Sequence, residues 1–413
     1  MDEEKGRRAF LGFVASAGAA SATGCLERVP FVGGSSDDDG GGNTTESDGG
    51  DEETADWSGF QYDDANTGYV SGVEAPTSSF GVDWEFETSR SVQSSPAVVD
   101  GTVYVGSYDR NVYAVDASDG SEVWSFETGY LIGLSSPAVA DGNVYVGSSD
   151  NNLYALDASD GSENWRYEAE GDVWSSPAVV EGTVYFGSGG AGDDVHALDA
   201  SNGDRLWGFK SNYSVGASPA VVDETVYIGS LDSNVYALDA SNGEELWRFE
   251  TDGEVLSSPT VAEVTREDSP TRAVFFGSSD ANIYAVDADD GTELWRYETG
   301  DKVVGSPAFA EGTVYVGSQD GLVYALDASN GDEYWSEETD GPVHSSPATA
   351  GGVVYVGSRD GFLYALRGDN GDELWSLETG EGVESSPGVD SSPALADGSV
   401  FFGANDGNVY RLS

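Results

Sequence analysis

Residues 94–128 read SSPAVVDGTVYVGSYDRNVYAVDASDGSEVWSFET, and this one stretch contains a complete structural unit. We expect four strands in it, over residues 96–99, 102–107, 111–116 and 122–128. Asp100-Gly101 and Asp119-Gly120 suit the first and last turns, because glycine accepts a positive φ without steric cost. The second strand is apolar on both faces, which is typical of a sheet that is covered on both sides.

The unit recurs along the chain with a period near 40 residues. Its tryptophan stands at eight positions: Trp84, Trp124, Trp165, Trp207, Trp247, Trp295, Trp335 and Trp375. Its proline keeps nearly the same spacing: Pro96, Pro137, Pro177, Pro219, Pro259, Pro307, Pro347 and Pro393. A fixed period near 40 with several short strands per unit is typical of a β-propeller. The chain is therefore predicted to be all-β, an eight-bladed β-propeller with four-stranded antiparallel blades.

The two ends of the array complement each other. Residues 81–88 form a tryptophan strand with no three strands before it, and the last unit, 393–413, has three strands and no tryptophan. We therefore expect 81–88 to pair with the three C-terminal strands and to supply the outer strand of the final blade. This pairing closes the ring and leaves no open sheet edge at its seam.

Six units carry the pattern Ala-x-Asp-x-x-x-Gly-x-x-x-Trp, as in Ala114 to Trp124. This pattern is similar to the tryptophan-docking repeat of the pyrroloquinoline quinone (PQQ) propeller family. That family includes quinoprotein alcohol dehydrogenases and the non-enzymatic lipoprotein scaffold BamB. The resemblance covers residues 81–413 and implies that the tryptophans form a belt that locks each blade to the next. The seventh copy departs from the pattern, since Arg367 replaces the aspartate.

The chain divides into four predicted parts: an export signal over 1–25, an acidic Gly/Ser tether over 26–56, a lead-in over 57–80 and the propeller over 81–413. Arg7 and Arg8 resemble a twin-arginine export motif, and the apolar stretch after them is too short to span a bilayer. Cys25, the only cysteine, ends a lipobox-like sequence and is the expected lipid anchor. The tether has too little apolar content to fold, so we expect disorder. The lead-in resembles that of BamB-like chains.

Charge predicts the environment and excludes one class of partner. The chain has 75 acidic and 17 basic residues, and its net charge is −58. Such self-repulsion destabilises a compact state, but at 1 M salt the Debye length falls to roughly 3 Å. The composition therefore indicates a halophilic, archaeal, extracytoplasmic protein on the outer surface of the cell membrane. Nucleic acid is excluded as a partner, because its binding needs a positive surface.

The loops fall on two faces, because successive strands run in opposite directions. The first–second and third–fourth turns repeat almost unchanged, and we call their side the uniform face. The connections on the other side differ between blades, and we call it the variable face. Diversified loops on a uniform scaffold usually carry binding, although drift of an unused face is the alternative. The candidate partner residues there are Gln93, Tyr108, Leu134, Trp174, Leu231, Gln319, His344, Arg359 and Glu384.

A quinoprotein dehydrogenase is one alternative function. The resemblance implies that such an enzyme holds PQQ on the axis, with Ca²⁺ bound by Glu and Asn, and that many carry a disulfide between adjacent cysteines. This chain has a single cysteine. Trp174 offers a stacking surface, and Glu384, Asn405 and Asp406 offer oxygen ligands to a hard cation. Asp406, however, has counterparts in six other blades, which indicates a turn residue.

Histidine chemistry is sparse, since the chain has only His196 and His344. His196 stands where other blades have tyrosine, so we expect it to pack as a strand residue, and no zinc ligand set is visible. The 48-residue step between tryptophans arises from residues 261–276, which we expect to form a longer loop on the uniform face.

The favoured function is a membrane-anchored, non-enzymatic scaffold that uses no cofactor and binds a protein at the variable face. A glycan-binding module is a second alternative, and it requires an exposed aromatic row there, beginning with Tyr108, Tyr130, Trp174 and Tyr213.

Overall fold

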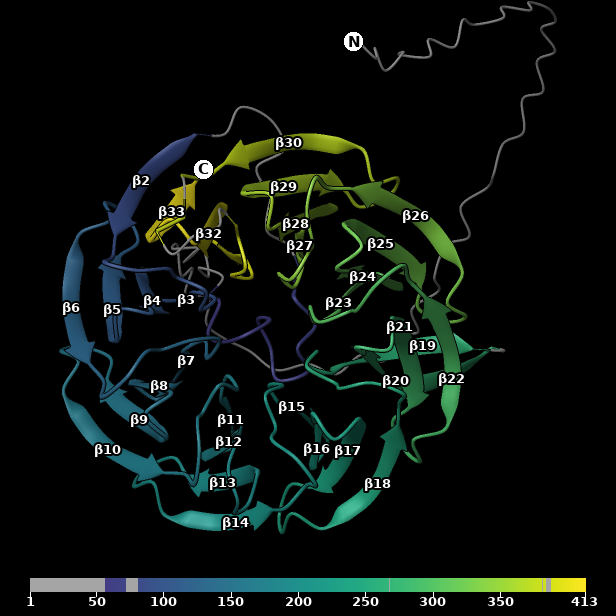
Figure 1. The fold of residues 1–413 in the computed structure, drawn as a ribbon, viewed down its shortest axis with the longest axis horizontal. Helices are drawn as coiled ribbons and strands as arrows, with labels where there is room; N and C mark the ends of the chain where they lie inside the picture. Colours follow the sequence, from purple (N-terminus) through teal and green to yellow (C-terminus); the bar gives the residue numbers. More distant parts are fainter. Residues whose placement is uncertain (1–55, 72–80, 267, 381, 384–387) are drawn as a thin grey trace, which may run out of the picture. The chain divides into compact units, whose positions relative to one another are not determined.

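The computed structural model describes residues 56–71, 81–266, 268–380, 382–383 and 388–413. Their strands form eight sheets, which stand as blades around a common axis (Figure 1). Within each blade the neighbouring strands are antiparallel, with the first strand innermost and the fourth at the rim. The predicted all-β, eight-bladed propeller is confirmed.

The first four blades follow one another directly. Blade 1 consists of β3 (Ala97–Val99), β4 (Thr102–Gly106), β5 (Asn111–Asp116) and β6 (Glu122–Glu127). Blade 2 consists of β7 (Ala138–Ala140), β8 (Asn143–Gly147), β9 (Asn152–Asp157) and β10 (Glu163–Glu168). Blade 3 consists of β11 (Ala178–Val180), β12 (Thr183–Gly187), β13 (Val195–Asp199) and β14 (Arg205–Phe209). Blade 4 consists of β15 (Ala220–Val222), β16 (Thr225–Gly229), β17 (Asn234–Asp239) and β18 (Glu245–Glu250).

The other four blades complete the circle. Blade 5 consists of β19 (Thr260–Arg266), β20 (Ser269–Gly277), β21 (Asn282–Asp287) and β22 (Glu293–Glu298). Blade 6 consists of β23 (Ala308–Ala310), β24 (Thr313–Gly317), β25 (Leu322–Asp327) and β26 (Glu333–Glu338). Blade 7 consists of β27 (Ala348–Ala350), β28 (Val353–Gly357), β29 (Phe362–Arg367) and β30 (Glu373–Glu378). Blade 8 consists of β31 (Ala394–Ala396), β32 (Ser399–Gly403), β33 (Asn408–Leu412) and β2 (Val82–Glu87).

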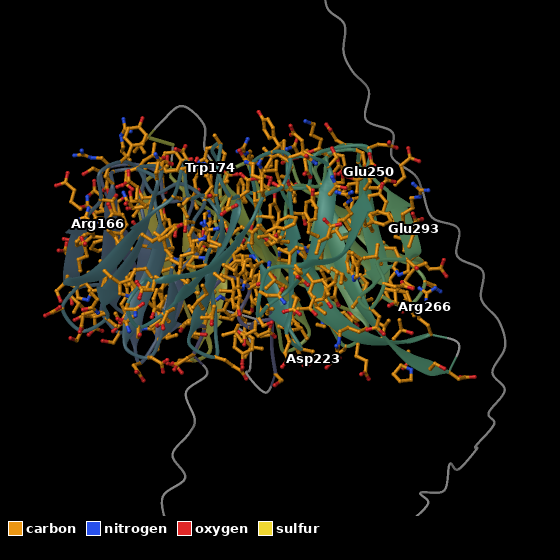
Figure 2. The ribbon with its side chains drawn as sticks, turned by 90° about the horizontal axis from the view of Figure 1, so that it is seen from below. Arg166, Trp174, Asp223, Glu250, Arg266 and Glu293 are labelled. Carbon is orange, nitrogen blue, oxygen red and sulfur yellow. The ribbon has the colours of Figure 1, made fainter. Side chains whose placement is uncertain are left out.

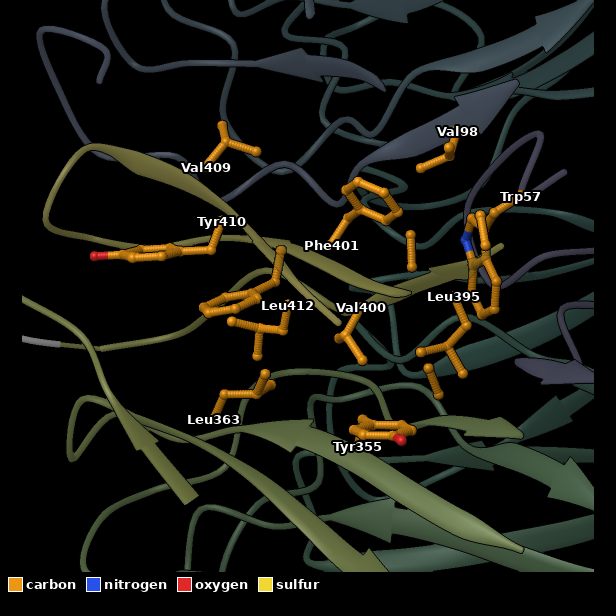
Figure 3. Close-up of a cluster of buried hydrophobic side chains, with 14 of the residues drawn as sticks. Trp57, Val98, Tyr355, Leu363, Leu395, Val400, Phe401, Val409, Tyr410 and Leu412 are labelled. Atoms are coloured by element: carbon orange, nitrogen blue, oxygen red, sulfur yellow. The ribbon is translucent and has the colours of Figure 1, made fainter. Parts of the chain in front are cut away.

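Blade 8 joins the two ends of the array, as the sequence predicts. Strand β2 pairs antiparallel with β33, with Trp84 opposite Arg411. Large apolar side chains from three neighbouring sheets fill the core around this seam, among them Phe401 of β32 and Tyr355 of β28 (Figure 3). The closing strand is thus held by backbone pairing and by burial, which is the dominant favourable term in folding.

Each blade docks on the next through its tryptophan. The indole N–H of Trp207 donates to the backbone oxygen of Ala240 at 2.7 Å, and the ring lies against Gly243 of the same neighbouring turn. The other described bonds of this kind join Trp84 to Ala117, Trp124 to Ala158, Trp165 to Ala200, Trp247 to Ala288, Trp295 to Ala328 and Trp335 to Gly368. The expected tryptophan belt is present.

An aspartate in the second–third connection fixes the loops of the variable face. In blade 2, Asp150 accepts hydrogen bonds from the hydroxyl of Tyr154 at 2.7 Å and from the N–H of Gly129 at 2.6 Å. Burial and this hydrogen bond raise the pKa of Tyr154 to about 12. Asp406 makes the equivalent bonds to Tyr410 and Gly380, which confirms the predicted turn role.

The described part of the lead-in, residues 57–71, crosses the centre of the ring (Figure 1). Its β1 (Tyr69–Val70) runs parallel to β27, and Trp57 exchanges two backbone bonds with Val98. Other backbone oxygens of the lead-in accept N–H groups from the innermost strands at Val139, Val221, Val261, Phe309 and Thr349. The bonded residues lie within the innermost strands, after the Ser-Pro step, and so on the side of the uniform face. The sequence predicts a lead-in here but not this path.

The insertion in blade 5 is a strand hairpin, not the expected loop. Residues Thr260 to Arg266 pair with Ser269 to Phe275, so β19 and β20 simply extend beyond the other blades. Figure 2 shows Arg266 at the same side as Asp223 of a first–second turn, and Trp174 at the opposite side. The predicted uniform face for the insertion is therefore correct.

His196 packs as a strand residue in β13, as expected. Its ring stacks on Phe186 with 4.7 Å between the centroids, and its Nε2 lies 2.9 Å from the hydroxyl of Ser188. Burial lowers the pKa of His196 to about 4. The imidazole is therefore neutral near pH 7 and acts as an aromatic core residue.

Alanine substitutions at two glycines of the same backbone conformation distinguish the energetic cost of disturbing a docked tryptophan from the cost of backbone strain. Gly243 and Gly182 have φ of +74° and +75°, but a Cβ at Gly243 meets Trp207 at 2.5 Å, whereas Gly182 faces open space. Gly182→Ala should cost only the left-handed backbone penalty of about 1 to 2 kcal/mol. Gly243→Ala should cost about 1 to 3 kcal/mol more, because the indole must move. Urea unfolding of both variants measures the difference, and equal losses would contradict the docking role.

Candidate functional site

A closed ring of serine hydrogen bonds surrounds the axis. The N–H of Ser95 in blade 1 donates to the hydroxyl oxygen of Ser136 in blade 2 at 3.0 Å. The ring then continues through Ser176, Ser218, Ser258, Ser306, Ser346 and Ser392, and returns to Ser95. Each blade thus contributes one donor and one acceptor, and this level of the axis is alike in all eight blades.

The residue two positions before each ring serine lies one level nearer the variable face. These eight residues are Gln93, Leu134, Trp174, Gly216, Leu256, Val304, His344 and Asp390, and all of them line one hollow. Blades 7, 8 and 1 contribute the polar members, whereas blades 2 to 6 contribute apolar side chains and a glycine. The hollow therefore has a polar side and an apolar side.

We call this hollow the axial cavity, and its volume is about 340 Å³. Seven of the eight ring serines, all but Ser136, form its lower wall, and Phe60 of the lead-in also lines it. Because the lead-in bonds the innermost strands on the other side of the serines, the described residues cover the axial cavity toward the uniform face. This volume lies at the lower end of the range that small-molecule sites occupy.

Asp390 organises the polar side of the axial cavity. Its carboxylate accepts hydrogen bonds from Arg359 Nε at 2.8 Å, Gln93 Nε2 at 3.2 Å and Asn405 Nδ2 at 3.1 Å. The side chain of Asp390 is only 4% exposed. A buried carboxylate needs such partners, so it fixes the side chains that surround it.

Sequence reasoning did not name Asp390. It placed Glu384 at the eighth position, because the blade contains two Ser-Ser-Pro copies and Glu384 precedes the first. The structure uses the second copy, Ser391-Ser392-Pro393, and so places Asp390 in line with Gln93 and His344. Glu384 itself lies outside the described residues. The duplicated tripeptide was the signal that could have identified Asp390.

Arg359 and His344 flank the buried carboxylate. Arg359 also donates through Nη2 to Asp390, and its side chain remains 45% exposed at the wall of the axial cavity. His344 Nδ1 lies 3.9 Å from Asp390 Oδ1. Burial, followed by the nearby charge of Arg359, lowers the pKa of His344, while the carboxylate opposes that shift. The cavity wall is therefore close to neutral at pH 7, with one cation and one anion.

The apolar side contains a recess at Gly216. A Cβ added there would lie 3.6 Å from both Leu231 and Leu256 and 4.0 Å from Trp174, which are ordinary contacts. Leu134 is 53% exposed at the rim of the axial cavity. This side of the cavity can therefore accept an apolar group.

The structure brings most of the predicted partner residues together. Gln93, Tyr108, Leu134, Trp174, Gln319, His344 and Arg359 all line the axial cavity. Leu231 lies behind the recess, next to Gly216. Tyr108 donates its hydroxyl to Gln93 at 2.6 Å and also lines a second hollow of about 300 Å³, beside Arg90, Arg110 and Tyr130.

The aromatic row required by a glycan-binding module is only partly formed. Trp174 is half-buried and donates its indole N–H to Ser149, whereas Tyr213 is 61% exposed in a rim loop. Tyr108 and Trp174 line the same cavity, but Tyr130 and Tyr213 belong to separate connections and do not line it.

The described side chains do not fit a calcium–quinone site. Both oxygens of Asp390 already accept hydrogen bonds, and Asn405 Oδ1 accepts one from Gln93. Asp406 is committed to its turn, and the guanidinium of Arg359 occupies the place beside the carboxylate. The described residues also contain no cluster of three or more His, Cys, Asp or Glu suited to a metal ion.

Two family models match the propeller region. One is described as "Beta-alanine-activating enzyme, beta-propeller" and matches residues 193–413, which is more than half of the chain. The other is described as "Outer membrane protein assembly factor BamB" and matches residues 67–207. The chain belongs to the PQQ-like β-propeller family. No curated protein matches this PQQ-like chain significantly.

Solved structures share the fold of this PQQ-like propeller at low identity. Quinohemoprotein alcohol dehydrogenase from Comamonas testosteroni has a TM-score of 0.74 at 19% identity, over 87% of this chain and 80% of that chain. A europium-containing methanol dehydrogenase has 0.75 at 16%, over 87% and 98%. BamB from Moraxella catarrhalis has 0.67 at 19%, over 81% and 98%. At such identities the likeness establishes the fold alone.

Cys25, Arg7 and Arg8 lie outside the described residues. Among the residues that are described, no helix has the length and apolar character needed to cross a bilayer.

The polar cluster predicts how His344 titrates. In wild type its pKa should lie below the ordinary value of about 6.5, so the unfolded chain takes up this proton first and stability falls as pH drops through that value. Arg359→Gln should raise the pKa of His344, and Asp390→Asn should lower it further, because each removes one neighbouring charge. NMR titration of the two histidine rings measures both shifts, with His196 as an internal reference. Shifts of the same sign in the two variants would contradict the cluster.

Proposed function

We propose that the propeller is a non-enzymatic binding module that holds a polypeptide partner at its variable face, with part of that partner seated in the axial cavity. The observation that carries this proposal is the position of the cavity. It lies on the side of the ring where the blades differ, and each of the eight blades contributes one residue to its wall, of seven different types. Such diversified positions on a rigid scaffold are suited to recognition.

The surroundings of the cavity support a macromolecular partner. Tyr130, Leu134, Tyr213 and Val383 are each more than half exposed in the connections of the variable face. Leu134 also lines the axial cavity, so apolar surface continues from the cavity to its rim, where a polypeptide can cover it. The hollow beside Tyr108 contains charges of both signs, since Asp109 lines it with Arg90 and Arg110, and Arg110 pairs with Glu127 at 2.6 Å.

Location is part of the proposal. We propose that Arg7 and Arg8 direct export and that a lipid on Cys25 holds the propeller at the outer membrane surface, with residues 26–56 as the tether. The mass of the mature N-terminal peptide decides this point, since an unmodified or uncleaved Cys25 would exclude the anchor.

A leucine at Gly216 tests the proposed function directly. Gly216 lacks a positive φ and its neighbours leave room for a Cβ, so Gly216→Leu should fold while filling the recess. Capture of the partner by full-length protein, cross-linked in native membranes, should fall by about fivefold to a hundredfold, because overfilling a site costs about 1 to 3 kcal/mol. Quantitative mass spectrometry of the captured proteins gives the readout.

Leu246→Ser is the matched control, because Leu246 is exposed on the outer strand β18 and far from the axis. It should leave the captured protein unchanged. Equal capture by wild type and Gly216→Leu would contradict binding at the axial cavity. Release of the captured material by a glycosidase would replace the polypeptide with a glycan partner.

A further inference from the structure

The axial cavity presents hydrogen-bond donors beside a carboxylate that is already fully bonded. The carboxylate of Asp390 is saturated by Arg359, Gln93 and Asn405. Each ring serine accepts an N–H at its hydroxyl oxygen, and its O–H forms no hydrogen bond among the described residues. The hydroxyls and Arg359 can therefore both donate to a ligand that supplies acceptors, which a carboxylate does best.

Arg359 is held ready for such an acceptor. Nε and Nη2 bind Asp390 at 2.8 and 3.3 Å, so the plane of the guanidinium is fixed, and Nη1 has no partner among the described residues. The side chain is 45% exposed and lines the cavity. A guanidinium fixed in this way loses little conformational freedom when it pairs with a carboxylate.

The closed floor limits what can enter. Because the lead-in crosses the ring and Phe60 lines the cavity, an extended chain cannot thread through the axis. A chain end can enter from the variable face, with its terminal side chain against Leu256, Trp174 and the recess at Gly216. Capture of a terminal carboxylate is an established mode of peptide recognition.

We propose that the axial cavity binds the C-terminal residue of a polypeptide whose last side chain is apolar. The terminal carboxylate pairs with Arg359 and the ring-serine hydroxyls, and the side chain fills the apolar side at Gly216. This proposal rests on the proposed function, because it specifies which part of the partner is seated in the cavity.

Synthetic peptides test the proposal without knowledge of the partner. The probes are fluorescein-labelled Gly-Ser-Gly-Ser-X peptides, where X is Leu, Phe, Val, Met, Ser or Lys, each as free acid and as C-terminal amide. Fluorescence anisotropy with the full-length protein in molar KCl gives the affinities. We expect peptides ending in an apolar free acid to bind, and their amides to bind about tenfold or more weakly, because a charge-assisted pair is lost.

Variants locate the contact. Arg359→Gln should weaken the free acids by about tenfold and leave the amides unchanged. Arg359→Gln alone leaves the buried carboxylate of Asp390 without its cation. The double variant Arg359→Gln with Asp390→Asn removes that carboxylate as well, and it should show the same loss of affinity for the free acids. Arg248→Gln, at an exposed ion pair on β18, is the control and should bind as wild type does.

The outcomes separate this proposal from the proposed function. Equal binding of acids and amides would overturn carboxylate recognition. Binding of 4-methylpentanoate as tightly as the leucine peptide would assign the cavity to a small organic acid. If no peptide binds while Gly216→Leu still loses its captured protein, the C-terminal reading is overturned and the binding module stands. If capture is also unaffected by Gly216→Leu, the proposed function falls.

Discussion

The serine ring is the constraint on which the rest of the structure depends. Eight backbone N–H groups at the axis each donate to the hydroxyl oxygen of the next blade, and the eighth returns to the first. A circle of this kind needs the same small residue in every copy and a fixed number of blades. Buried backbone groups must be paired, so no blade can lose its serine without exposing a neighbour's donor. Diversity is therefore confined to the positions that lie outside the ring.

The site follows from this constraint and from the lead-in. The ring sets the width of the axis and supplies hydroxyl groups, while the lead-in seals the axis toward the uniform face. One level above the serines, each blade is free to carry a different residue, and three adjacent blades carry the polar group built on Asp390. Proteins of one fold acquire separate functions through such positions. Here the saturated carboxylate of Asp390 and the turn-bound Asp406 disfavour a cation site, although dehydrogenases share the propeller.

The amino-acid sequence was sufficient to predict the structure wherever a feature repeats. The tryptophan period predicts eight blades, the unmatched strand 81–88 predicts closure, and the monotony of one set of turns separates the two faces. It failed where a feature occurs once. The lead-in has no period, and its backbone forms single bonds or short pairings with the innermost strands of six blades, which side-chain patterns do not reveal. The eighth position of the cavity wall was assigned to Glu384. Blade 8 contains two Ser-Ser-Pro tripeptides and the serine ring uses only one of them, and spacing alone cannot show which.

Amide hydrogen exchange at the ring serines tests the closed ring most directly. The account predicts that the N–H of Ser392, which donates to Ser95 across the seam at 2.9 Å, is as strongly protected as the other seven. Exchange in this ring should then require opening of the whole propeller. Rapid exchange at Ser392 and Ser346, at the rate of surface loops and with slow exchange elsewhere, would show an open seam and would contradict the account.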